Sequence, residues 1–453
     1  MKEGNSVELR FSNRDLRKLI VPLVIEQFLQ FSAGLITSIM VAGLGEAAVS
    51  AVSLVDSVFI LFITLFSALA TGGAVVAGQL IGLGDLKEGC KAAWQMILFV
   101  GLSSVAVMAL CYLGHNFILD TVFGDITPEV RQNARTFLLI TNASIPVIAL
   151  YNGGAAIFRV MGNSKISMKM SLLMNVINIA GIAVLIYGFG MGIEGAGIAL
   201  FTGRAIAAVV ILKLLTNQDL PLHIRKPLTF RFDGKLLRRI LRIGVPNGLE
   251  NSMFQLGKIL VLSLVSSFGT ASIAANAVGN AVAMFGVTPG MAMNLAVVTV
   301  ISQCVGAGQF DQVKYYTKKL MKLCYGMMAV SNVVILLILP LLLKIYDLSP
   351  EATEMARQIL VYHSICAITI WTPAFTMPYV LRAGNDVAPT MLISILSMWV
   401  FRVVFSYILG RYLGLGLFGV WVSMTIDWLV RGIAFLIRYR QEKWIEKSGG
   451  MIA

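Results

Sequence analysis

A succession of long apolar runs constrains this chain more than any other feature of its sequence. A run of about 20 apolar residues fits the hydrocarbon core of a bilayer, and a helix satisfies its own backbone hydrogen bonds there. The chain is 57% apolar, with a mean hydropathy of +0.82. We therefore predict an all-α integral membrane protein with twelve spanning helices, at 16–42, 48–80, 91–114, 132–158, 166–190, 193–215, 238–266, 272–304, 316–344, 355–381, 388–412 and 418–438. No cleavable signal peptide is expected, because the first run is long and lacks a small-residue cleavage site.

The net charge of +13 could indicate a nucleic-acid partner, but the placement of the basic residues does not. If the ends of the spans alternate between the two sides, one side holds 27 of the 36 Lys and Arg and the other side holds five. This bias is the positive-inside pattern of membrane proteins. It predicts a multi-pass protein of the cell (inner) membrane, with both termini in the cytoplasm and no nucleic-acid partner.

The chain repeats itself with an offset of 224 residues. The matched pairs include Pro22 and Pro246, Glu26 and Glu250, Gly45 and Gly269, Gly82 and Gly306, and Gly192 and Gly416. The segment FRVMGN (158–163) corresponds to LRAGN (381–385) after a small indel. A chance similarity would not keep one offset over so many positions.

The repeat predicts two six-helix lobes: an N-lobe at 1–216, a basic cytoplasmic linker at 217–237 and a C-lobe at 238–453. Since six is even, both halves enter the membrane from the same side, which makes the repeat parallel. Parallel repeats are typical of transporters, whose substrate site lies near the midplane at the interface of the repeats. We expect access to alternate as one lobe rocks against the other.

Once the loops, the termini and the ends of the spans are set aside, eight charged residues remain inside the predicted spans, where each is costly unless it faces a wet cavity or a partner. They are Glu26, Asp56, Arg204, Glu250, Lys258, Arg402, Asp427 and Arg431. Asp427 and Arg431 are four residues apart on one helix, so we predict a structural ion pair. The basic residues Arg204 and Arg402 could neutralise buried acids or anchor helices, and Lys258 could hold a counter-charge or extend towards water.

Three of the acids are predicted to lie near the midplane. Counting about 1.5 Å per helical residue puts Glu26, Glu250 and Asp56 roughly 12–16 Å into a core of about 30 Å. A carboxyl in a dry pocket can exchange a proton near neutral pH, and with neighbouring oxygens it can bind Na⁺. Competition between such an ion and an organic cation for one carboxylate would give antiport. Pro22 and Pro246 each free a carbonyl one turn earlier and can bend their helices.

The five cysteines are scattered and form no CxxC pair, so we interpret them as small apolar packing residues. The sequence holds no P-loop, no HExxH and no DDxxD-type motif, and we expect neither an enzyme nor a bound cofactor. It also holds no segment that suggests a channel filter. Met284, Met291 and Met293 would suit a promiscuous pocket.

Taken together, several segments resemble the multidrug and toxic compound extrusion (MATE) family, within the larger group that includes polysaccharide exporters and lipid flippases. The resemblance covers essentially the whole chain and rests on MVAGLGEAAVSAVSL (40–54), ATGGAVVAGQLIGLGD (70–85), FRVMGN (158–163), NVINIAG (175–181), RIGVPNGLE (242–250), FGTASIAANAVGN (268–280), VGAGQ (305–309) and RAGND (382–386). It implies two six-helix lobes in a V shape, and export of organic cations driven by inward H⁺ or Na⁺.

The chain departs from many bacterial members of that family in the N-lobe. Where such members have an aspartate in the first span, this chain has Thr37, and it has Ile182 where they often have a second one. With Asn178 and Thr202, which are present here, those acids form the cation site of such members. Our hypothesis is that Glu26 and Asp56 replace this site and that Glu250 serves the C-lobe.

The resulting prediction is a secondary antiporter, expected to be a monomer, that exports organic cations or drugs in exchange for H⁺ or Na⁺. The alternative is a flippase of a lipid-linked or amphipathic substrate, in which Arg402, Lys258 and Arg204 would meet a pyrophosphate. The predicted ion-coupling residues are Glu26, Asp56, Glu250, Asn178, Thr202 and Thr37. The predicted substrate-binding residues are Gln30, Phe31, Phe254, Gln255, Lys258, Asn280, Met284 and Arg402.

Overall fold

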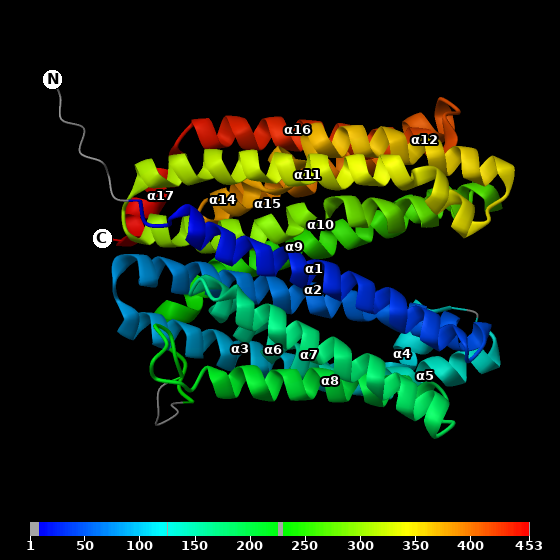
Figure 1. The fold of residues 1–453 in the computed structure, drawn as a ribbon, viewed down its shortest axis with the longest axis horizontal. Helices are drawn as coiled ribbons and strands as arrows, with labels where there is room; N and C mark the ends of the chain where they lie inside the picture. The colour runs from blue at the N-terminus through cyan, green and yellow to red at the C-terminus, as the bar shows by residue number, and fades with distance from the viewer. Residues whose placement is uncertain (1–8, 125, 225–229, 453) are drawn as a thin grey trace.

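The computed structural model describes residues 9–124, 126–224 and 230–452, and the secondary structure in these ranges is helical throughout (Figure 1). The first half of the chain forms α1 (Asn13–Ala42), α2 (Glu46–Leu83), α3 (Leu86–Leu113), α4 (His115–Phe117), η1 (Ile118–Val122), α5 (Pro128–Asn142), α6 (Ser144–Val160), α7 (Ser164–Ile182), η2 (Ala183–Gly188) and α8 (Ile193–Leu214). The second half forms α9 (Gly234–Ser266), α10 (Thr270–Gly306), α11 (Phe310–Tyr346), α12 (Pro350–Cys366), η3 (Ala367–Trp371), α13 (Thr372–Phe375), α14 (Met377–Ala383), α15 (Val387–Ser397), η4 (Met398–Val404), η5 (Ser406–Tyr412), α16 (Gly416–Arg440) and α17 (Lys443–Ile452). The segments labelled η are π-helical, with a wider turn than an α-helix.

The helix boundaries confirm the internal repeat. The second helix of each half, α2 or α10, begins at residue 46 or 270, and the third, α3 or α11, begins at residue 86 or 310. The turn before α2 and α10 uses a glycine at the same repeat position, Gly45 or Gly269, with φ of 103° and 100°. A residue with a Cβ rarely adopts these angles, so the same turn recurs because the same glycine does.

Each predicted apolar run coincides with a helix or with consecutive helical segments. Within the described ranges, ten helices are long and apolar enough to cross a membrane, and the pair α5–α6, bent by 46°, brings the number to eleven. The remaining predicted span, 238–266, is α9, which carries Glu250 and Lys258 along its length. α9 begins at Gly234, so helical structure starts inside the predicted linker. The part of that linker at 225–229 lies outside the described residues.

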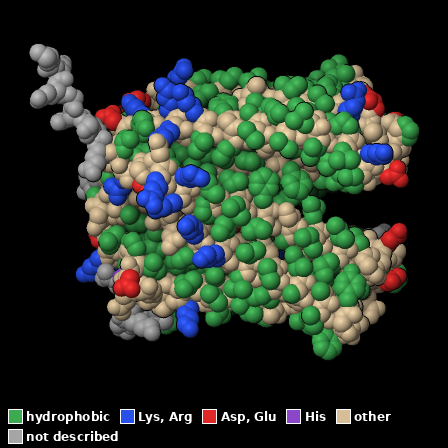
Figure 2. Space-filling model, in the orientation of Figure 1, with side chains coloured by type: hydrophobic (Ala, Val, Ile, Leu, Met, Phe, Trp, Pro, Cys, Tyr) green, Lys and Arg blue, Asp and Glu red, His purple; other side chains and the backbone are tan. Residues whose placement is uncertain are grey.

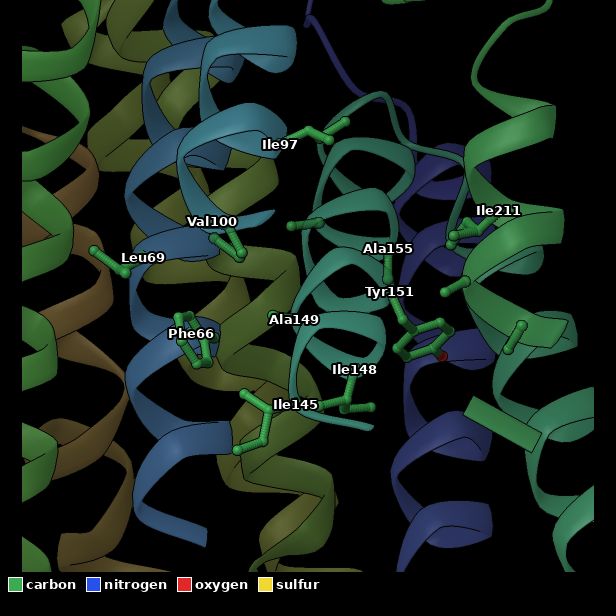
Figure 3. Close-up of a cluster of buried hydrophobic side chains, with 14 of the residues drawn as sticks. Phe66, Leu69, Ile97, Val100, Ile145, Ile148, Ala149, Tyr151, Ala155 and Ile211 are labelled. Carbon is green, nitrogen blue, oxygen red and sulfur yellow. The ribbon is translucent and has the colours of Figure 1, made fainter. Parts of the chain in front are cut away.

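Two hydrophobic cores organise the molecule. Figure 3 shows part of the N-lobe core, where α6 brings Ile145, Ala149 and Tyr151 against side chains of the surrounding helices. The beginning of each half's first helix, α1 or α9, packs into the core of the other lobe. Leu16, Leu19, Ile20 and Leu23 of α1 belong to the C-lobe core, whereas Leu236, Ile240 and Ile243 of α9 belong to the N-lobe core. Accordingly α1, α2, α9 and α10 occupy the middle of the molecule in Figure 1.

The two ends of the molecule differ in charge and in contact between the lobes. Lys and Arg side chains gather at the end where α1 begins and α17 lies, and the lobes meet there (Figure 2). At the opposite end Figure 2 shows a cleft between the lobes. We call these the basic end and the open end.

Candidate functional site

The first buried acid, Glu26, lies on α1 with no exposed surface. Ser167 Oγ of α7 donates a hydrogen bond of 2.7 Å to its carboxylate, and Arg159 Nη1 of α6 lies 3.3 Å from the other oxygen. Arg159 also donates to Ser167 Oγ at 3.1 Å. A buried carboxylate needs such partners, because removing it from water without them costs several kcal/mol.

The C-lobe repeats this arrangement. Glu250 of α9 forms an ion pair of 2.5 Å with Arg382 of α14, whose side chain is buried. Arg159 and Arg382 are the arginines of the matched segments FRVMGN and LRAGN, so the two pairs are equivalent under the repeat. The sequence reasoning missed both arginines, because it assigned them to cytoplasmic ends. The matched segments could have revealed both arginines, because the arginine occupies the same position in FRVMGN and in LRAGN.

Immediately beside these pairs, the two lobes bind each other through a matched pair of glutamines. Gln303 of α10 donates its amide to the carbonyl of Val160 at 2.7 Å. Gln79 of α2, which is 224 residues earlier, donates to the carbonyl of Ala383 at 2.9 Å. Val160 and Ala383 each directly follow the arginine that pairs with Glu26 or Glu250. We call these two glutamines and the carbonyls they bind the inner gate.

Glycines allow α2 and α10 to approach closely at the inner gate. A Cβ on Gly306 would lie 1.9 Å from the carbonyl oxygen of Gln79, and a Cβ on Gly82 would lie 2.1 Å from that of Gln303. Both distances are far shorter than a van der Waals contact. The two glycines are related by the repeat offset, so the close contact is itself symmetric.

Pro22 acts on the same region from within α1. It has no N–H, so the carbonyl of Lys18 loses its helical partner. The hydroxyl of Ser164, the first residue of α7, lies 3.2 Å from this carbonyl and 2.7 Å from that of Leu19. Ser164 of α7 thus binds α1 at the carbonyl that Pro22 frees and at the next one.

The residues predicted to form an N-lobe cation site are only partly brought together. Asn178 donates to Thr37 Oγ1 at 3.1 Å, whereas the hydroxyl of Thr202 bonds to its own helix at Ile198. Asp56 is exposed and has no ion-pair partner among the described residues. Glu26 lies eleven residues before Thr37, about 16 Å along α1. Glu26 is therefore remote from Thr37 and has partners of its own.

A cavity of about 550 Å³ lies inside the C-lobe, between α9, α10, α12, α14, η4 and α16. Of the predicted residues, Glu250, Phe254, Lys258, Asn280, Met284 and Arg402 border it. All its lining residues fall between 250 and 431, so this cavity lies within one lobe. A substrate site at the interface of the repeats stays a prediction.

Several predicted substrate residues do not line this cavity. Gln30 is exposed and Gln255 is half-buried. Phe31 packs edge-on against Phe285 of α10 with ring centroids 4.4 Å apart, which links α1 to the C-lobe. Met291 borders the cavity with Met284, but Met293 is fully buried in the C-lobe core.

The basic residues around the cavity outnumber the acids. Asp427 and Arg431 form the predicted ion pair at 3.0 Å, and Ser397 donates to Asp427 at 2.6 Å. Lys258 and Arg402 have no acidic partner within 4.0 Å in the described ranges. Arg204, in the N-lobe, donates to Ser144 Oγ at 2.7 Å. No three His, Cys, Asp or Glu of the described residues cluster to hold a metal ion.

Comparison with known proteins gives a consistent result. The family model MatE matches twice, at 22–184 and at 246–408, and the two matches are again 224 residues apart. The probable multidrug resistance protein YoeA of Bacillus subtilis (strain 168) is 28% identical over 449 residues, which covers 96% of this chain and 95% of that protein.

Solved structures share the fold over nearly the whole chain. An outward-facing multidrug resistance MATE family transporter of the MOP superfamily matches with a TM-score of 0.90 and 20% identity, and covers 99% of this chain and 100% of its own. A MOP superfamily transporter from Pyrococcus furiosus Vc1 matches with a TM-score of 0.88 and 21% identity, over 96% of each chain. The latter is described as having a binding pocket of reverse polarity that suggests a different function for that protein.

Proposed function

Since this chain belongs to the MatE family and is therefore a multi-pass membrane transporter and not an enzyme, we propose that it is a secondary antiporter. In this proposal it exports small organic molecules in exchange for H⁺ or Na⁺ by alternating access between the two lobes. It acts as a monomer in the cell membrane. The basic end faces the cytoplasm with both termini, so the cleft at the open end faces outward.

One observation carries this proposal: each arginine that pairs with Glu26 or Glu250 directly precedes the residue whose carbonyl belongs to the inner gate. Glu26 holds the side chain of Arg159, whose own carbonyl accepts from Thr299 of α10 at 3.1 Å. The next carbonyl, that of Val160, accepts from Gln303. An ion that neutralises Glu26 releases Arg159 and loosens the end of α6. The hydrogen bonds that close the cytoplasmic side weaken as a result, which links ion binding to the change of access.

Ion-driven transport in liposomes tests the proposal. We would use two fluorescent probes of fixed and opposite charge, a pyrene sulfonate and a pyrene with a trimethylammonium group, and impose a pH gradient or a Na⁺ gradient separately. We expect one gradient to drive accumulation of a probe, and Glu26→Gln to reduce this driven transport by about tenfold or more.

The matched control is Glu129→Gln, which makes the same change at an exposed residue in the first turn of α5. This variant should transport like the unmodified protein. Two results would refute the proposed coupling. One is transport by the unmodified protein at the same rate with and without either gradient, and the other is gradient-driven transport that persists in Glu26→Gln.

Organic cations are the substrate class that the family resemblance implies, but the charges of the C-lobe cavity do not favour that class. Lys258 and Arg402 border the cavity without an acidic partner. The same observation favours a second candidate function, a flippase of a lipid-linked or amphipathic substrate with a phosphate or pyrophosphate. A flippase would move a lipid across the membrane, and not a soluble organic molecule.

A further inference from the structure

The cavity in the C-lobe carries a surplus of positive charge. Two acids, Glu250 and Asp427, lie in this region. Glu250 is paired with Arg382 at 2.5 Å, and Asp427 is paired with Arg431 at 3.0 Å. Lys258 and Arg402 also border the cavity and belong to neither ion pair. Four basic side chains against two acids leave a net charge of two positive units beside the cavity.

The basic groups converge on one aromatic ring. The Nζ atom of Lys258 lies 5.1 Å from the centroid of the Phe254 ring, and the guanidinium of Arg402 lies 5.2 Å from it. The guanidinium of Arg431 lies 5.7 Å from the same ring. The face of one phenyl ring attracts a cation only weakly, whereas three cations around it repel one another. An anion bound among them would relieve that repulsion.

Several buried donors at the cavity have no acceptor in the described part of the protein. They are the Nε atoms of Arg382, Arg402 and Arg431 and the indole N–H of Trp428. Each of these side chains is at least nine-tenths buried, and all of them border the cavity. A buried donor without an acceptor is costly, so the four donors favour a ligand that brings acceptor oxygens.

The cavity also has an apolar aromatic wall. Trp371 and Phe375 stack with ring centroids 5.0 Å apart and an interplanar angle of 23°. Both border the cavity, which at about 550 Å³ has the size of a site for a drug-sized molecule. A flat apolar body would contact this wall while its charged end reached the cations.

We infer that the substrate of the C-lobe cavity is an amphipathic organic anion, with an aromatic or apolar body and a carboxylate, sulfonate or phosphate group. Lys258 and Arg402 bind the anionic group, because they alone among the four basic residues have no acidic group within 4.0 Å. An organic cation would enter a region that is already positive, and both acids there are engaged. The inference rests on the proposed export function and adds its substrate class.

The inference also assigns the coupling role to the N-lobe. A proton on Glu250 would free Arg382 and strengthen the binding of an anion, which is the opposite of what antiport requires. Glu26 is the equivalent carboxylate in the other lobe, and an ion bound there does not touch the substrate. The inside-negative membrane potential itself favours the exit of an anion.

Binding of the two pyrene probes to the purified full-length protein tests this inference without any ion gradient. Both probes keep their charge at every pH used, and the indoles of Trp371 and Trp428 report their arrival by fluorescence. We expect the sulfonate to bind at least about tenfold more tightly than the trimethylammonium probe, and Lys258→Met or Arg402→Met to weaken it by about tenfold. Glu250→Gln should tighten sulfonate binding.

The controls are Lys344→Met and Arg411→Met, which remove exposed basic residues of the same lobe. Both should leave the affinity unchanged, and Arg402→Lys should keep the preference for the sulfonate. Unchanged thermal unfolding of each variant excludes loss of the fold. An equal or tighter affinity for the cationic probe, or sulfonate binding that survives Lys258→Met and Arg402→Met together, would overturn the inference.

A competition experiment identifies the source of the anionic group. Nanodiscs of zwitterionic lipid are prepared with or without a phosphomonoester lipid. Displacement of the sulfonate by this lipid would support an anion site for a lipid headgroup, and displacement by soluble aryl phosphate alone would support one for a free organic anion.

Failure of this inference and failure of the proposed antiport give different results. A preference for the cationic probe would contradict the anion site and leave the antiport proposal standing. Absence of ion-driven transport would contradict antiport and leave the anion site standing.

Discussion

Most acids inside the spans of this protein are held by arginines, and the cause is the cost of desolvation. Glu26, Glu250 and Asp427 each have an arginine within 3.3 Å. Asp56 differs, because its side chain is exposed and no basic group of the described residues lies within 4.0 Å of it. In a membrane protein such pairs are where an arriving ion has the largest effect, because neutralising one member leaves the other charge without a partner.

A further buried acid, Asp386, lies outside the spans and links the last two helices to the loop before α15. Burial alone would raise its pKa, but hydrogen bonds from Arg438 at 2.7 Å and Lys447 at 2.5 Å outweigh burial and hold the pKa below its ordinary value. A carboxyl with a lowered pKa stabilises the fold above its unfolded-state pKa, and this contribution is lost as the pH falls through the folded-state pKa.

We therefore expect Asp386→Asn to lower the free energy of unfolding by about 3 kcal/mol near pH 7, because it leaves two basic groups without a carboxylate. The difference from the unmodified protein should fade as the pH falls below about 4. Thermal unfolding in detergent over this pH range measures it. A difference that stays constant down to low pH would show that the Asp386 carboxylate is not its source.

At the scale of single residues, the sequence predicted which charged residues lie inside the spans better than it predicted which residues pair with them. The acids stand out because each interrupts an apolar run, and the spacing of Asp427 and Arg431 predicted their ion pair correctly. Arg159 was missed because it lies in the last turn of a helix, where a basic residue ordinarily faces the cytoplasm.

At the scale of helices, the molecule depends on glycines where two backbones meet. Gly306 of α10 lies against the backbone of Gln79 in α2, with no room for a Cβ. We expect Gly306→Ala to push the two helices apart and to destabilise the closed inner gate by about 1–3 kcal/mol. The loss would appear as a lower temperature of thermal unfolding in detergent.

Gly326→Ala in α11 is the matched control, because a Cβ there would meet nothing within 4 Å. It should be neutral or slightly stabilising, since alanine favours the helix over glycine. Equal effects of the two substitutions would mean that the close approach of α2 and α10 does not govern stability.

Helix positions were predictable because hydrocarbon demands long apolar runs and the repeat supplies a second copy of each. Which helices pack against one another was not predictable from the sequence. Lipid tails and a protein interior are equally apolar, so hydropathy does not tell which face of a helix is buried. This is why the sequence did not reveal that α1 packs into the C-lobe core or that the cavity lies within one lobe.

At the scale of the whole molecule, two symmetric hydrogen bonds are among those that join the lobes at the basic end. We expect Gln79→Leu and Gln303→Leu each to leave a buried carbonyl without its donor and to raise the opening of the inner gate by about tenfold. Amide hydrogen exchange at the inner ends of α2 and α10 measures this opening. Gln358→Leu, at an exposed position of α12, is the control. Exchange that does not increase in either gate variant would argue against the inner gate.

The most direct test of the central claim, antiport coupled through Glu26, reverses the direction of drive. Liposomes are loaded with the pyrene sulfonate, no ion gradient is imposed, and the pH or Na⁺ concentration of the lumen is followed with a trapped dye. Antiport predicts that the exit of the probe drives H⁺ or Na⁺ into the lumen, and that Glu26→Gln abolishes this ion movement. If the probe leaves while no ion enters, or if an ion leaves with it, the account of the protein as an antiporter is wrong.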